Sequence, residues 1–169
     1  MVDLHCHILH GIDDGARSLE ESVHLCRIAA DNSIQIAVAT SHLVHPEDVN
    51  EFVRIRDKRI NELRRVLDEK KIPLEIVSGA EVFVNDDIFY APSLDAVTLG
   101  GSRYILIEFD FNGLNITRII KYIEELLARG YIPIIAHPER YRFMQHDYDI
   151  VNHLADMGVL FQINSSSLA

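Results

Sequence analysis

Two histidines lie two residues apart at the start of the chain, in a stretch that is typical of a strand. In an extended strand, side chains two residues apart point to the same face, so His5 and His7 would share one face with Asp3. Leu4 and Cys6 would then face the other side. Neutral imidazole is a common ligand of transition metals. The pair therefore indicates a metal site, with a solvated edge strand as the alternative, and the chain contains nine histidines in 169 residues.

Acidic residues and further histidines follow the other predicted strands in the same way. They are Asp13-Asp14 after the first strand, His42 after Ile36–Thr40, Glu81 after Leu74–Ala80, Glu108 after Tyr104–Ile107, and His137 after Ile132–Ala136. The carboxyl ends of parallel strands are where α/β proteins build their active sites. Carboxylates and imidazoles that converge there are best explained by bound divalent cations.

Arg140 follows His137 by three residues, and its guanidinium beside a metal cluster could hold a phosphate through two parallel hydrogen bonds. A structural ion pair with one of the many acids is the alternative. The other histidines are weaker candidates. Predicted helices carry His24, His146 and His153, which we expect at the surface, whereas His10 and His45 fall in loops and stay open.

The elements that must position these residues alternate between short apolar strands and amphipathic helices. The predicted strands are Val2–Cys6, Ile34–Thr40, Leu74–Val82, Tyr104–Phe109, Ile132–Ala136 and Val159–Ile163. Four helices are predicted. The first begins after Ser18, and the second spans Pro46–Lys71 and buries Phe52, Ile60, Leu63 and Leu67. The third follows the apolar stripe Ile116–Leu127 and ends at Gly130, and the fourth covers Asp147–Met157. This alternation predicts a parallel sheet, either doubly wound or a barrel. No linker or repeat interrupts it, so we expect one domain over residues 1–169.

Composition narrows the function classes. The chain carries 26 acidic residues against 16 Lys and Arg, a net charge of −10, which argues against nucleic acid or anionic membrane as a partner. Neither an apolar run of about 18–20 residues nor a signal peptide is evident, so we expect no membrane insertion and a cytoplasmic location. Cysteine-based phosphatase chemistry is excluded, because neither Cys6 nor Cys26 is followed by arginine six positions later.

Six blocks of this sequence together resemble one superfamily. They are Asp3-Leu4-His5-Cys6-His7-Ile8-Leu9, Gly11-Ile12-Asp13-Asp14-Gly15-Ala16, Ala39-Thr40-Ser41-His42, Ser78-Gly79-Ala80-Glu81-Val82, Leu106-Ile107-Glu108-Phe109 and Ile135-Ala136-His137-Pro138-Glu139-Arg140-Tyr141. In this order they resemble the PHP (polymerase and histidinol phosphatase) superfamily. Within it, the chain is most similar to the bacterial manganese-dependent tyrosine-protein phosphatases of capsule and exopolysaccharide operons.

The resemblance implies a distorted (β/α)7 barrel with up to three divalent metal ions, manganese first and iron or zinc as alternatives. By position it implies Arg140 as the phosphate-binding, catalytic arginine, Glu81 as a bridging ligand, and a ligand set of His5, His7, Asp14, His42, Glu81, Glu108 and His137. The substrate it implies is phosphotyrosine on the tail of a bacterial tyrosine kinase that controls polysaccharide synthesis.

The chain departs from the family pattern in three places. Ser41 and His10 stand where proline is usual, and the sequence ends at Ala169, before the family's Asp-x-His ligand pair and second phosphate-binding arginine. We therefore expect a barrel truncated at its C-terminal end, a fragment or a naturally short chain, with one metal position incomplete. We also expect an unpaired edge near Val159–Ile163, possible homo-oligomers through that edge, and weak activity at best as a monomer.

Two other functions stay open. A histidinol-phosphate-type phosphatase would share the metals but act on a small alkyl phosphate. The Ile12-Asp13-Asp14-Gly15 and Glu139-Arg140-Tyr141 segments are closer to the tyrosine phosphatases. A non-catalytic binding module that contains metal is the second alternative.

Overall fold

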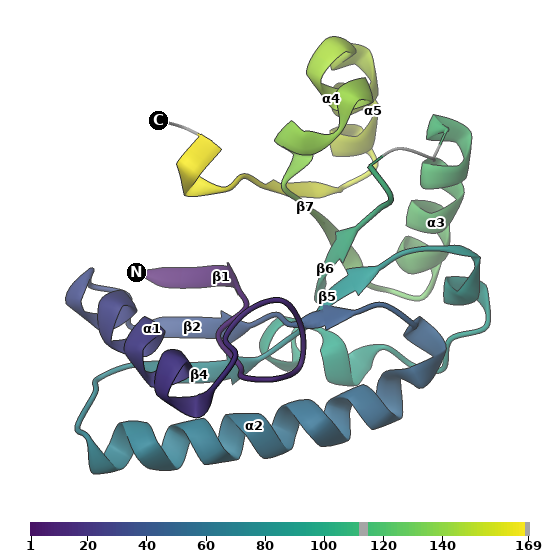
Figure 1. Ribbon diagram of the computed structural model, residues 1–169. Coiled ribbons are helices and arrows are strands. Elements are labelled where there is room, and N and C mark those ends of the chain that lie inside the picture. Colours follow the sequence, from purple (N-terminus) through teal and green to yellow (C-terminus); the bar gives the residue numbers. More distant parts are fainter. Residues whose placement is uncertain (112–114, 168–169) are drawn as a thin grey trace.

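Two parallel β-sheets form the centre of the computed structural model, which describes residues 1–111 and 115–167 (Figure 1). The first sheet has the order β1 (Val2–Cys6), β2 (Ile36–Ala39), β4 (Glu75–Ser78). The second has the order β3 (His42–Leu43), β5 (Glu81–Phe83), β6 (Tyr104–Glu108), β7 (Ile132–Ala136), β8 (Leu160–Gln162). Every pair of neighbouring strands is parallel, which confirms the predicted parallel α/β class.

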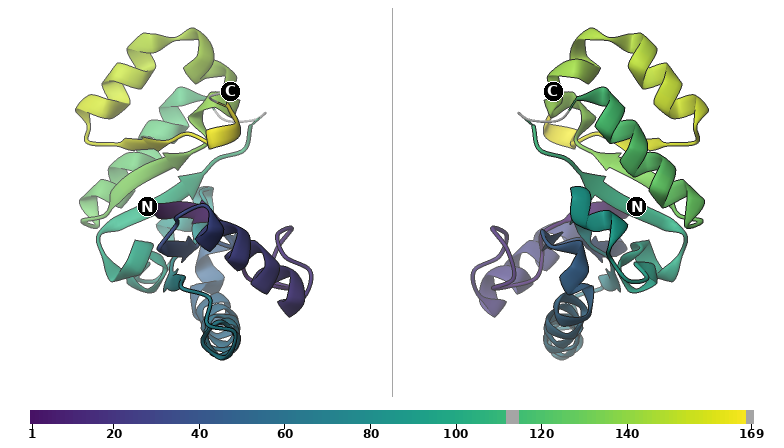
Figure 2. Two further views of the ribbon diagram at one scale, coloured as in Figure 1. Left: turned by 90° about the vertical axis from the view of Figure 1, so that its left-hand side faces the viewer. Right: turned by 90° about the vertical axis from the view of Figure 1, so that its right-hand side faces the viewer.

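Helices flank both sheets. They are α1 (Leu19–Asp31), α2 (Val49–Glu69), α3 (Ile116–Ala128), α4 (Arg142–His146) and α5 (Tyr148–Asp156). Short 3-10 turns cover Pro46–Asp48, Asp86–Phe89, Asp95–Val97, Leu99–Gly101, Pro138–Arg140 and Ser165–Ser167. In Figures 1 and 2, α1 and α2 accompany the first sheet, and α3, α4 and α5 accompany the second. All four predicted helices are present, and only α4 lies outside the predicted segments.

The helix cap and the apolar stripe that the sequence predicted are both present in the structure. The Ser18 hydroxyl accepts a hydrogen bond from the backbone N–H of Glu21, which caps α1. The apolar stripe of α3 is buried at Ile119, Ile123 and Leu126, and Tyr122 joins it. Each such aliphatic side chain contributes about 1.5–3 kcal/mol when it leaves water, so these faces hold the helices on the sheets.

The prediction of one continuous strand over Leu74–Val82 is wrong. The chain forms β4, turns through Gly79-Ala80, and begins β5 in the other sheet. A side chain at Gly79 would bring its Cβ within 2.8 Å of Val38 Cγ1, so only glycine allows this close approach. A second break of the same kind lies earlier in the chain, where β2 ends at Ala39 in the first sheet and β3 begins at His42 in the second. These two breaks join the sheets and make His42 and Glu81 register partners.

The predicted alternation of faces along β1 is also wrong in part. A register shift between Asp3 and Cys6 interrupts its pairing with β2. Leu4 lines an apolar cavity of about 340 Å³, and Asp3 lines a different cavity beside Cys6 and α1. His5 still points into the cleft at the end of the strand, together with His7. The bulge therefore turns the Asp3 side chain out of the cleft, and its Oδ1 accepts a hydrogen bond from His5 N at 3.1 Å.

The second sheet ends at β8, which pairs with β7 alone in the described part of the chain. The edge predicted near Val159–Ile163 is therefore confirmed. Among the same residues β1 pairs only with β2, so it forms an edge of the first sheet. Association of two copies through these edges stays a prediction.

A buried arginine forms hydrogen bonds that stabilise the turn between β4 and β5. Arg56 of α2 is 2% exposed, and its Nη1 donates to Gly79 O (3.1 Å) and Ala96 O (2.7 Å). Arg56 falls on the helix face predicted to be apolar, and its charge is partnered by Asp57 Oδ1 at 2.8 Å. The guanidinium satisfies the carbonyl oxygen of Gly79 in this turn and ties it to Ala96 of the 3-10 segment Asp95–Val97.

We predict that Arg56→Met lowers the free energy of unfolding by about 2–4 kcal/mol, because it leaves buried carbonyl oxygens without donors. Arg54→Met on the same helix is the matched control, since the Arg54 side chain is 68% exposed and forms an ion pair with the helix residue Glu51, which is also exposed. The control should change stability by less than about 0.5 kcal/mol. Urea denaturation measures both, and equal midpoints for the two variants would contradict the assignment.

Candidate metal centre

A cleft of about 490 Å³ lies where the two sheets meet. It is lined by His5, His7, Asp14, Gly15, His42, Glu81, Glu108, Phe111, His137, Arg140 and Asn164. The structure thus brings together every residue that the sequence singled out as a metal ligand or phosphate-binding group. His5 and His7 lie at the end of β1, Glu108 ends β6, and His137 follows β7. His42 and Glu81 begin β3 and β5, directly after the two breaks.

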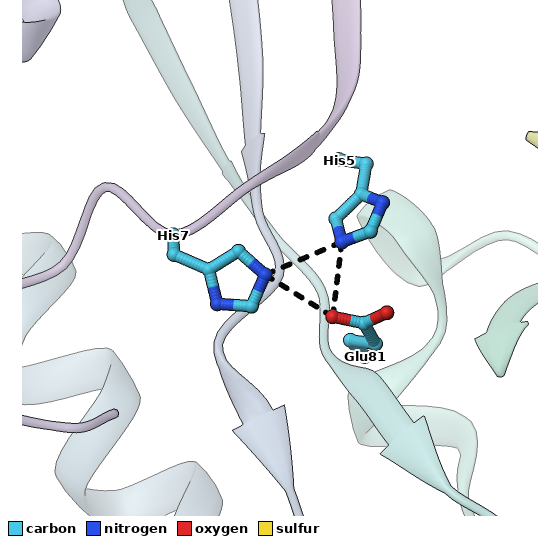
Figure 3. Close-up of side chains that lie close together, drawn as sticks. All are labelled: His5, His7 and Glu81. Atoms are coloured by element: carbon cyan, nitrogen blue, oxygen red, sulfur yellow. Dashed lines mark hydrogen bonds and ion pairs between the residues drawn. The ribbon is translucent and has the colours of Figure 1, made fainter. Parts of the chain in front are cut away.

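Glu81 lies at the centre of the cleft and is 1% exposed. Its Oε2 is 2.9 Å from His5 Nε2 and 3.1 Å from His7 Nε2, as Figure 3 shows. The other oxygen, Oε1, lies 2.8 Å from His137 Nε2. One buried carboxylate therefore contacts three imidazoles.

The outer nitrogens of two of these rings face oxygen acceptors. His7 Nδ1 is 2.8 Å from Asp13 Oδ2, and His5 Nδ1 is 2.6 Å from Gln162 Oε1. With Nδ1 protonated, each neutral ring directs its Nε2 lone pair toward Glu81, and the two Nε2 atoms are 3.2 Å apart. Three electron-rich atoms so close together need a cation or added protons between them.

This donor set fits a divalent transition metal. Two ligand atoms at right angles about an ion at about 2.1 Å are separated by about 3.0 Å. The distances between His5 Nε2, His7 Nε2 and Glu81 Oε2 run from 2.9 to 3.2 Å. The mixture of imidazole and carboxylate suits manganese, iron or zinc.

Two further groups could hold ions beside the first. They are His7, Asp14 and His42, and His42, Glu81 and Glu108, each with ligand atoms within 4.8 Å of one another. His42 Nδ1 lies 2.8 Å from Glu108 Oε1 and 3.5 Å from Glu81 Oε2. Asp14 is the most exposed of these side chains, at 84%, and its Oδ1 is 3.6 Å from His42 Nε2.

Local backbone structure holds the histidines in place. At the end of β1, Cys6 N donates to Thr40 Oγ1, and Thr40 N donates to Cys6 O. The following loop folds back so closely that a Cβ at Gly15 would lie 2.2 Å from His7 O. His137 has φ +37°, a left-handed conformation that costs free energy in a non-glycine residue and is typical of functional sites.

The contacts shift the pKa values of the site residues. Burial alone would lower the pKa of His7, but hydrogen bonds to Asp13 and Glu81 outweigh it and raise the pKa to about 10. His137 follows the same pattern through Glu108 and Glu81, with a pKa of about 9. Burial would raise the pKa of Asp13, but the hydrogen bond from His7 lowers it to about 2. The pKa of Glu81 is likewise lowered far below its usual range, despite burial, by the three imidazoles.

The structure shows contacts at the site that the sequence did not predict. Asp13, not only its neighbour Asp14, reaches the site, and its carboxylate also accepts from the backbone N–H groups of Gly15 and His42. Phe111 lines the cleft and stacks on Tyr141 at a centroid distance of 5.2 Å. Gln162 and Asn164 come from β8 and the residues after it. Only the Asp13-Asp14 pair carried a sequence signal.

The remaining histidines lie outside the cleft. His24, His146 and His153 are exposed, as predicted. His10, left open by the sequence, packs beside α2 with Nε2 3.4 Å from Glu62 Oε2, and the His45 side chain is 61% exposed.

Comparison with known proteins identifies the family. Residues 1–169 match the family described as "Capsular polysaccharide synthesis, CpsB/CapC". The chain belongs to this family.

Members of the CpsB/CapC family with names and structures share most of the chain. A Staphylococcus aureus protein named CapC is 37% identical over 170 residues, and the tyrosine-protein phosphatase YwqE of Bacillus subtilis is 34% identical over 174 residues. These matches cover 99% and 100% of this chain, but 66% of each relative, so the chain spans just under two thirds of their length. A solved chain from work on YwqE of B. subtilis and CpsB of Streptococcus pneumoniae, described as metal-dependent tyrosine phosphatases, superimposes with a TM-score of 0.83 at 32% identity. It covers 99% of this chain and 68% of that one.

In the described residues, none of the helices combines the length and the apolar character needed to cross a bilayer.

We predict that metal binding strengthens as pH rises from 6 to 9 and releases protons. Without metal, His7 and His137 hold protons up to pKa values of about 10 and 9, and a metal must displace these protons. The folded pKa of His7 lies above the ordinary 6.5, so its ion pair stabilises the metal-free fold fully below pH 6.5, and this stabilisation is lost as pH rises through about 10.

Titration calorimetry with Mn²⁺ at several pH values, in buffers of different ionisation enthalpy, measures affinity and proton release together. Asp13→Asn should reduce the proton release, because the pKa of His7 falls without its carboxylate partner. An affinity independent of pH would contradict this description of the site.

Proposed function

We propose that this chain carries the catalytic centre of a metal-dependent protein-tyrosine phosphatase. The observation that carries the proposal is the buried Glu81 carboxylate, shared by His5, His7 and His137, with Arg140 lining the same cleft. We propose manganese as the metal, with iron or zinc as alternatives, in up to three positions. The ligands would be His5, His7, Asp14, His42, Glu81, Glu108 and His137.

The metal ions, when bound, supply a nucleophilic water at neutral pH and neutralise charge on the phosphate. The chain's own residues hold the substrate for that chemistry. Arg140 is exposed, lines the cleft, and forms no ion pair within residues 1–111 and 115–167. Its guanidinium is therefore available for two parallel hydrogen bonds to phosphate oxygens. The leaving phenolate has a pKa of about 10 and needs less protonation than an alkoxide.

Phe111 supports an aryl substrate over an alkyl one. Its ring is 40% exposed at the cleft, where it stacks on Tyr141 and lies 5.3 Å from the ring of His137. Tyr141 is fully buried, and its hydroxyl accepts a hydrogen bond from Phe109 N. A rigid aromatic surface beside the phosphate site favours the ring of phosphotyrosine.

The family description and the relatives' names support a protein substrate in capsule or exopolysaccharide synthesis. We propose the phosphotyrosine tail of a bacterial tyrosine kinase as that substrate, in the cytoplasm, where the unpaired Cys6 and Cys26 would stay reduced. We also propose that residues 1–169 act as one domain of a distorted (β/α)7 barrel. The outward helices and the breaks that bend β2 and β4 into the second sheet support this architecture.

We predict manganese-dependent release of phosphate from a phosphotyrosine peptide, abolished by chelation and lowered at least 100-fold by His5→Ala. His24→Ala is the matched control, since His24 is exposed and distant from the cleft. Faster hydrolysis of histidinol phosphate than of the peptide would favour the small-molecule alternative. Metal binding without hydrolysis of either substrate, or of p-nitrophenyl phosphate, would leave a metal-containing binding module.

We predict that Arg140→Ala raises KM for the peptide about tenfold or more and leaves the metal content unchanged. The guanidinium binds phosphate in the ground state as well as in the transition state, so its loss acts mainly on KM. Steady-state kinetics and elemental analysis on the same sample provide both quantities. Wild-type kinetics in this variant would show that Arg140 has no role at the phosphate.

A further inference from the structure

Gln162 joins the two sheets at their edges. It is the last residue of β8, and its side chain reaches His5 of β1, where Oε1 lies 2.6 Å from His5 Nδ1. β1 and β8 belong to different sheets and share no strand pairing in the described residues. The contact therefore links a metal-ligand candidate to the opposite edge of the structure.

The orientation of the Gln162 amide is determined by its other partners. Its Nε2 donates to Ile163 O at 3.0 Å and to Asn164 Oδ1 at 3.2 Å. A backbone carbonyl can only accept, so the NH₂ group must face Ile163 and the amide oxygen must face His5. His5 Nδ1 is then the donor, so in the neutral ring Nε2 carries the lone pair.

We infer that Gln162 is a positioning residue for the metal centre: it selects the His5 tautomer whose Nε2 faces His7 and Glu81. This inference rests on the metal centre of the proposed function. Asp13 orients His7 through the same kind of hydrogen bond to Nδ1, but there the acceptor is a charged carboxylate. A neutral acceptor orients the His5 ring without adding a further negative charge beside Glu81, Glu108 and Asp14. Outer partners of this kind change metal affinity by about 10- to 100-fold.

Nitrogen NMR of the Zn²⁺-loaded protein reads directly which nitrogen of His5 carries the proton, because a proton and a metal ion cannot share Nε2. We expect a protonated Nδ1 in the wild type and in Gln162→Glu, which keeps an acceptor at this position. Gln162→Leu should shift His5 toward the Nε2-protonated form and weaken Mn²⁺ binding about 10- to 100-fold by calorimetry. Gln35→Leu is the matched control, because Gln35 is an exposed residue held by backbone hydrogen bonds to Met1 and Glu75.

Asn164→Ala tests whether the effect on His5 comes from Gln162 itself or from a general change in the residues that line the cleft. Ile163 O still orients the amide in that variant, so the His5 tautomer should be unchanged. Wild-type tautomer and Mn²⁺ affinity in Gln162→Leu, beside normal Mn²⁺ binding by the wild type, would overturn the role of Gln162 alone. A wild-type protein that binds no Mn²⁺ would instead overturn the proposed function on which this role rests.

Discussion

A buried carboxylate that touches three imidazoles is the interaction on which the rest of the structure depends. Glu81 is almost completely inaccessible to water, and an unpaired charge there would cost several kcal/mol. His5, His7 and His137 come from distant parts of the sequence and meet on its two oxygens. The carboxylate therefore requires positive charge in the cleft, as protons at low pH or as metal ions when they are present.

The breaks in the sheets are what place Glu81 there. If β4 continued straight into β5, as an uninterrupted strand would, residue 81 would extend beyond the first sheet instead of beginning a strand in the second. The turn is possible because Gly79 packs closely on Val38, and because Arg56 satisfies the carbonyl oxygen that the turn releases. A helix residue that does not line the cleft thus contributes to the geometry of the site.

Sequence reasoning predicted the features that depend on local pattern. The stripe of α3 and the cap at Ser18 follow from periodicity and short-range hydrogen bonds, and the candidate ligands follow from their places after strands. The edge at β8 follows from the number of predicted strands, which is too small to close the barrel that the family resemblance implies. It did not predict the break at Gly79-Ala80, the bulge in β1, the hydrogen bond between His7 and Asp13, or the contact of Gln162 with His5. Each of these depends on tertiary contacts: a glycine is needed where another strand approaches, and Gln162 matters only because β8 comes opposite β1. The resemblance to a known family indicated Asp14, whereas the geometry shows that its neighbour Asp13 orients His7.

The most direct test of the metal centre is the anomalous scattering of crystals grown with manganese and measured on both sides of the manganese absorption edge. We expect a peak bonded to His5 Nε2, His7 Nε2 and Glu81 Oε2, at about 2.0–2.3 Å from each atom. Empty density at that position would contradict it, most clearly if manganese were found instead at the exposed group His45, Glu47 and Asp87.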